Sequence, residues 1–166
     1  MKKKIVMACL ALTLLLSACS GGTPAETTTA PMETTAVAET TIAETTTVSQ
    51  DDLRKAYITL VTPTMNKNWG DNYKIEEYGD AIHICVWKEG IAEASVMVRD
   101  EPTEEYKAMW NQMKEGIASF SKSAKEVGNS IGYEGVVAVN VMNDINKDNV
   151  LLTFADGVCI YDVTEN

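Results

Sequence analysis

The chain has 166 residues and a formal net charge of −10, and 45% of its residues are hydrophobic. Residues 51–166 are numerous enough to bury an apolar core without help from a metal ion or several disulfides. This stretch carries 11 basic and 20 acidic residues, a net charge of −9. Nucleic-acid binding depends on Lys and Arg that neutralise phosphates, so the acidic balance argues against a nucleic-acid partner.

The N-terminal 18 residues have the parts of a secretory signal peptide. Three lysines, Lys2 to Lys4, precede an apolar run at residues 5–16 that is broken only by Thr13. This run is too short for a membrane span, which needs about 20 apolar residues in a helix. Positive charge, a short apolar run and small residues at its end together predict a segment that directs export and is removed.

The apolar run ends in Leu16, Ser17, Ala18 and Cys19. This sequence resembles the lipobox of bacterial lipoproteins. The resemblance implies that residues 1–18 are cleaved off, that the Cys19 sulfur receives a diacylglyceryl group, and that acyl chains such as palmitate anchor the protein. Two or three acyl chains hold a protein stably in a bilayer. We therefore expect Cys19 to tether the chain to the cell membrane, facing outside the cytoplasm. The alternative is an ordinary signal peptide with a chance cysteine.

Residues 19–50 begin at that cysteine and continue as a Thr-rich linker. Among residues 20–50 there are 11 Thr, five Ala and four Glu, and few bulky apolar side chains. Such a composition cannot bury enough surface to offset the conformational entropy of the chain. We expect a disordered spacer with a reach of about 30 Å. This arrangement resembles small uncharacterised single-domain lipoproteins of Gram-positive bacteria, a resemblance that implies no activity.

The exported domain, residues 51–166, begins with a predicted helix. Apolar residues recur at helical spacing, at Leu53, Ala56, Tyr57, Leu60 and Val61. Ser49 is suited to cap this helix, and Pro63 is expected to end it. A hairpin follows, with strands at residues 73–78 and 81–87 and a tight turn at Gly79 and Asp80.

Residues 91–98 are ambiguous between strand and helix. Val96 and Val98 favour a strand, whereas the Ala-rich start suits a short helix, and we expect a strand. A long helix is then predicted from Pro102, which suits a first helical turn, to Gly128, which suits a C-cap.

The last third of the chain predicts three strands, at residues 136–142, 150–155 and 158–163. Asp156 and Gly157 give a strong hairpin signal between the last two. The order helix, strands, helix, strands predicts an α+β domain of two layers, with an antiparallel sheet and two helices on one face.

His83 is the only histidine. It shares a predicted strand face with Cys85 and Trp87, while the intervening apolar residues take the core face. A Cys–His nucleophilic pair needs contact within hydrogen-bond reach, but residues two apart on a strand are about 6.5–7 Å apart. We therefore expect no catalytic residues here.

Cys85 and Cys159 are the two cysteines of the exported domain. Export permits a disulfide between them, and the alternative, which the sequence favours, is two separate thiols. Two Cys and one His without tight ligand spacing do not make a zinc site. We expect neither metal nor cofactor.

Residues 143–149, "NDINKDN", begin like a calcium-binding loop, with Asp144, Asn146 and Asp148 at alternating positions. The pattern fails afterwards, because Asn149 stands where Gly is needed and Ala155 where a bidentate acid is needed. We therefore expect a hairpin loop in which Asn and Asp bond to the local backbone.

Two candidate binding surfaces remain. Trp69 lies in a predicted polar loop, where it can anchor a partner or fold back onto the core. The strand face with His83, Trp87, Cys159 and Tyr161 is a docking surface if no helix covers it.

The main hypothesis is a non-catalytic, membrane-anchored module that binds a protein, a peptide or another cell-envelope ligand. A first alternative is a small envelope enzyme whose site assembles only in the folded chain. A second alternative is a solute-binding accessory of a transporter. The second is weaker, because such proteins usually close two lobes around a solute.

Overall fold

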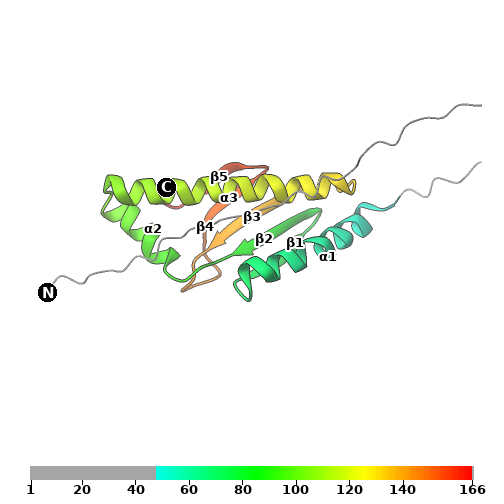
Figure 1. Ribbon diagram of the computed structural model, residues 1–166, viewed down its shortest axis with the longest axis horizontal. Helices are drawn as coiled ribbons and strands as arrows, with labels where there is room; N and C mark the ends of the chain where they lie inside the picture. Colours follow the sequence, from blue (N-terminus) through cyan, green and yellow to red (C-terminus); the bar gives the residue numbers. More distant parts are fainter. Residues whose placement is uncertain (1–47, 166) are drawn as a thin grey trace, which may run out of the picture. The chain divides into compact units, whose positions relative to one another are not determined.

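The computed structural model describes residues 48–165 (Figure 1). The signal peptide, the lipobox and the linker up to residue 47 lie outside the described residues. Three helices and five strands follow one another in the order α1 (Gln50–Trp69), β1 (Tyr73–Tyr78), β2 (Ala81–Val86), α2 (Ile91–Asp100), α3 (Glu104–Ser130), β3 (Val137–Met142), β4 (Val150–Ala155) and β5 (Val158–Asp162). The predicted α+β class is confirmed.

The strands form one sheet in the order β1-β2-β3-β4-β5. Three of the four pairings are antiparallel, but β2 and β3 run parallel, with Ile84 beside Val139. The prediction of a wholly antiparallel sheet was therefore wrong. The connection from β2 to β3 contains α2 and α3, and a crossover of this length can carry the chain from the end of β2 back to the opposite end of the sheet, where β3 begins beside the start of β2.

The core lies between one face of the sheet and the helices. Alternate residues of the central strands face it, including Ile84 of β2, Val139 of β3 and Phe154 of β4, all at most 2% exposed. The opposing helical side chains are Tyr57, Val61, Met65, Trp110, Ile117 and Ala124. These residues come from α1 and α3. The predicted packing of two helices on one sheet face is therefore confirmed for α1 and α3.

Helix α1 starts as predicted, with the Ser49 hydroxyl accepting a hydrogen bond from the Asp52 amide at 3.1 Å. It does not end at Pro63, which lies inside the helix on the exposed side. An internal proline costs about 3 kcal/mol. The buried residues Tyr57, Val61 and Met65 continue at a spacing of four past Pro63, so packing on the core offsets this cost.

The expected strand at residues 91–98 is a helix, α2. Its first amides are satisfied from a distant loop, since the Asp144 carboxylate accepts hydrogen bonds from the Gly90 and Ala92 amides at 2.8 and 2.9 Å. A carboxylate at a helix N-terminus also favours the helix dipole. No sequence pattern near residue 91 indicates this cap, which explains why a strand was predicted at residues 91–98.

Both predicted hairpins are present. Gly79 has a φ of +61° in the β1–β2 turn, and Asp156 and Gly157 have φ values of +51° and +82° between β4 and β5. Two positive φ values at the centre of a two-residue turn match the right-handed twist of the strands. The long helix is capped by Thr103, just after Pro102, and runs two residues past Gly128 to Ser130.

Candidate functional site

His83 and Cys85, the pair for which no catalytic role was expected, lie on the sheet face opposite the main core. The Asn140 side-chain amide of β3 lies 3.1 Å from the His83 Nδ1 and 3.7 Å from the Cys85 Sγ, and thus joins the two β2 side chains. Cys85 also donates to the Glu76 carboxylate at 3.6 Å. The side chains of Glu76, Cys85, His83 and Asn140 thus form a hydrogen-bonded network across β1, β2 and β3.

This Cys–His–Asn arrangement is unsuited to nucleophilic attack. Cys85 is 1% exposed, so a substrate cannot reach its sulfur. Burial is the main cause that raises the pKa of the Cys85 thiol above its usual range, and this favours the unreactive neutral form. Asn140, rather than a direct Cys–His contact, links the pair, as the spacing along the strand led us to expect.

The two cysteines are free thiols. Cys85 lies on β2 and Cys159 on β5, with β3 and β4 between them. Adjacent strands are about 4.8 Å apart, so the two positions are too distant for a disulfide. In this structure Cys85 and Cys159 are therefore two separate thiols.

The predicted docking face is not one surface. Trp87 is only 9% exposed, and the Lys147 ammonium lies 4.2 Å from the centroid of its ring. His83 packs edge-on against Tyr78, with ring centroids 5.0 Å apart. Cys159 packs instead against the main core, on the side of the helices.

Trp69 is the last residue of α1 and does not lie in a loop. Its ring lies 6.5 Å from that of Phe120 on α3, and it packs against the main core. Of the two roles considered for Trp69, packing is the one that this placement supports.

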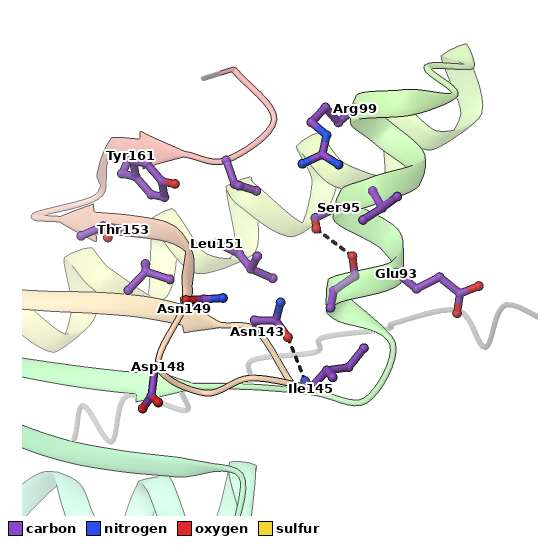
Figure 2. Close-up of a pocket in the computed structure, with 14 residues that line it drawn as sticks. Glu93, Ser95, Arg99, Asn143, Ile145, Asp148, Asn149, Leu151, Thr153 and Tyr161 are labelled. Carbon is purple, nitrogen blue, oxygen red and sulfur yellow. Dashed lines mark hydrogen bonds between the residues drawn. The ribbon is translucent and has the colours of Figure 1, made fainter.

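Tyr161 is exposed to a different degree, because it lines a large hollow in the surface of the described chain. This hollow, of about 870 Å³, lies between α2 and the end of the sheet where β4 begins and β5 ends (Figure 2). We call it the α2 groove. Its size is in the range of sites that hold small molecules or short peptides.

Apolar side chains form much of the wall of the α2 groove, and a few polar groups interrupt them. The apolar lining residues are Ala92, Val96, Ile145, Val150, Leu151 and Val163. Among the polar ones, Figure 2 shows the Arg99 guanidinium, the Asn149 amide and the Tyr161 hydroxyl directed into the hollow. An apolar groove with a few converging polar groups is the usual form of a ligand site.

The loop of residues 143–149 builds the lower wall of the groove, and its own hydrogen bonds hold it. The Asn143 Oδ1 accepts from the Ile145 and Asn146 amides at 2.8 and 2.9 Å, and the Asn146 Oδ1 accepts from the Asp148 amide at 3.2 Å. Asp144 caps α2. The predicted Asn/Asp turn is confirmed, and within residues 48–165 no group of three or more His, Cys, Asp or Glu is arranged to hold a metal ion.

Of the residues that line the α2 groove, the sequence analysis singled out only Tyr161 as a candidate for binding. Arg99, Asn143 and Asn149 were missed as binding residues, because residues 91–98 were expected to form a strand. Recognition of α2 as a helix would have placed Arg99 in its last turn, four residues after Ser95 and on the same side. Only the contact with the residue 143–149 loop, however, turns that side into a groove.

The comparisons with known proteins supply no relative. No protein family, no curated protein and no solved structure matches this chain. In the described part of the chain, none of the helices combines the length and apolar character needed to cross a bilayer.

Proposed function

We propose that this chain is a lipid-anchored, extracytoplasmic binding module that takes its ligand in the α2 groove. The observation that carries the proposal is the groove itself, an 870 Å³ hollow with apolar walls and inward-directed polar groups. The acylated Cys19 supplies the attachment to the membrane, and the Thr-rich linker separates the module from the bilayer.

Binding is favoured over catalysis by the position of the reactive side chains. The thiol best placed beside a histidine, that of Cys85, is buried and lies outside the groove. The polar side chains directed into the groove are instead amides, a hydroxyl and one guanidinium, groups that orient a ligand by hydrogen bonds, while the carboxylates of Glu93 and Asp148 point away from it. The envelope-enzyme alternative has no comparable observation behind it.

The lipid anchor can be tested in cells grown with radioactive palmitate. We expect the label in the wild-type protein and none in the Cys19→Ser variant, because the thioether to the diacylglyceryl group cannot form. Equal labelling of the two proteins would contradict the anchor. Cell fractionation gives a second reading, since Cys19→Ser should move from the membrane to the soluble exported fraction.

The binding role can be tested by photocrosslinking in intact cells. Ile145 is 83% exposed and lines the groove, whereas Leu60 is 53% exposed on α1 and does not line it. With benzoylphenylalanine at each position in turn, we expect a discrete adduct from position 145 and none from position 60. A groove filled by Val96→Trp should lose that adduct. Equal adducts from both positions, or an adduct that survives Val96→Trp, would overturn the proposal.

A further inference from the structure

We infer that the α2 groove binds the free carboxylate of a short peptide-like ligand, with Arg99 as the residue that contacts the carboxylate. This inference rests on the proposed function and specifies the class of its ligand. It follows from the direction of the charged groups, the donors that the groove presents, and the length of its apolar wall.

The charged side chains that line the groove differ in whether they point into the hollow or away from it. In Figure 2 the Arg99 guanidinium points into the hollow, while the carboxylates of Glu93 and Asp148 point away from it. The charged group directed into the hollow is therefore the Arg99 guanidinium, which is paired with Asp100, in a domain whose net charge is −9. One guanidinium matches one carboxylate, and a ligand with many negative charges would be repelled by the rest of the domain.

Arg99 is held only by a contact that a ligand can replace. Its Nε and Nη2 donate to the two carboxylate oxygens of Asp100 at 2.7 and 3.2 Å, and both side chains are about half exposed. Exposed ion pairs of this kind contribute about 0–1 kcal/mol. A ligand carboxylate can thus take the place of Asp100 at small cost, and the planar guanidinium can hold it through two parallel hydrogen bonds.

The remaining polar groups suit the amide groups of a peptide. Both lone pairs of the Asn143 Oδ1 are engaged by the Ile145 and Asn146 amides, which fixes the orientation of this side chain and directs its NH2 elsewhere. Figure 2 shows this NH2 directed into the groove, as is the amide of Asn149. Side-chain amides offer both donors and acceptors, the pattern that a peptide backbone also presents.

The apolar wall sets the length of the ligand. Ala92 and Arg99 both line the groove from the same helix, and seven residues of helix extend about 10 Å. An extended peptide covers about 3.3 Å per residue, so about three residues fit beside α2. Val96 and Leu151 lie along this length and can contact apolar side chains of the ligand.

The inference is tested with two probes that differ only in the carboxylate, acetyl-trialanine as the free acid and as the C-terminal amide. Each is titrated into the exported chain, residues 19–166 with Cys19→Ser, and binding is followed by the NMR shifts of the groove amides. We expect the acid to bind at least fivefold more tightly than the amide, with the largest shifts at Val96, Arg99 and Asn149.

Three variants sharpen the result. Arg99→Gln should make acid and amide bind equally, and Lys55→Gln, an exposed charge on α1, should leave their ratio unchanged. Asp100→Asn removes the competing carboxylate and should tighten binding of the acid about two- to threefold. A ratio that survives Arg99→Gln would overturn the inference.

The outcomes separate this inference from the proposed function. If acid and amide shift the groove amides equally, the carboxylate assignment is wrong while a groove ligand remains. If neither probe binds but the crosslink from position 145 persists, the ligand is not a peptide carboxylate. If the crosslink is absent as well, both proposals fail.

Discussion

Tyr161 and Asp162 are neighbours on β5, yet one side chain faces a solvent-accessible groove and the other lies in a buried hydrogen-bonded cluster. Tyr161 faces the α2 groove and is 37% exposed, whereas Asp162 is 3% exposed. Asp162 accepts hydrogen bonds from the Lys114 ammonium at 2.7 Å, the Trp110 indole at 3.2 Å and the Thr164 hydroxyl at 2.8 Å. We call these four residues the Asp162 cluster.

The difference shows how to separate polar groups that stabilise the fold from those available to a ligand. In the Asp162 cluster donors and acceptors are used within the protein, and they join β5 and the C-terminal segment to α3. In the α2 groove polar groups from α2, the residue 143–149 loop and β5 converge on a hollow instead. Alternation along a strand is enough to send adjacent residues into such different settings.

The largest effect on stability is expected from Asp162→Asn. The variant keeps the shape of the side chain but removes the charge that faces Lys114, whose side chain is only 19% exposed. We expect a loss of about 3 kcal/mol in the free energy of unfolding, measured by urea titration. Glu104→Gln is the control, because the exposed Glu104–Lys107 pair should contribute about 0.5 kcal/mol or less. Equal losses of unfolding free energy in the two variants would mean that the buried Asp162 cluster contributes no more than an exposed ion pair.

The same cluster predicts a dependence on pH. Burial opposes ionisation of Asp162, but hydrogen bonds from Lys114, Thr164 and Trp110 outweigh it and hold the pKa of this carboxyl below its usual range. A lowered folded-state pKa contributes stability above the unfolded pKa, near 3.9, and this is lost as the pH falls through the folded pKa. Wild type should lose more stability between pH 7 and pH 3 than Asp162→Asn. Parallel losses in urea titrations at the two pH values would contradict this.

The next largest effect is expected from Asp144→Ala. The change removes the acceptor of the Gly90 and Ala92 amides at the start of α2. Loss of a helix cap costs about 1–2 kcal/mol, and amide hydrogen exchange should speed up at these two residues. Asp148→Ala, in the same loop but without a cap, should stay within about 0.5 kcal/mol of wild type. A similar effect of both variants would mean that the loop as a whole, and not the cap, holds α2.

The smallest effect is expected from Lys147→Gln, which removes the ammonium above the Trp87 ring. A cation–π contact at a partly exposed site contributes about 0.5–1 kcal/mol. The unfolding free energy should fall by about that amount, and the fluorescence of the native protein should change because Trp87 loses its charged neighbour. A stability loss as large as that of Asp144→Ala would place Lys147 among the residues that hold the groove wall.

Much of the sheet could be predicted from the sequence, because hairpins depend on neighbouring residues. The turn at Asp156 and Gly157 and the strands on either side of it follow from local conformational preference. Pro63 and residues 91–98 were misjudged for the opposite reason. In the first, packing of Met65 overrides a local stop signal, and in the second a carboxylate from another part of the chain supplies the cap.

The sequence by itself determined the α+β class, the two hairpins and the pairing of Asn and Asp with the backbone in the residue 143–149 loop. It also predicts Cys19 as the lipid attachment site. Only the tertiary structure decided that α2 is a helix, that a groove lies beside it, and that Tyr161 and Asp162 have different surroundings. The physical reason is distance along the chain: the Ala92–Asp144 and Trp110–Asp162 hydrogen bonds each join residues 52 positions apart, beyond the reach of any local pattern.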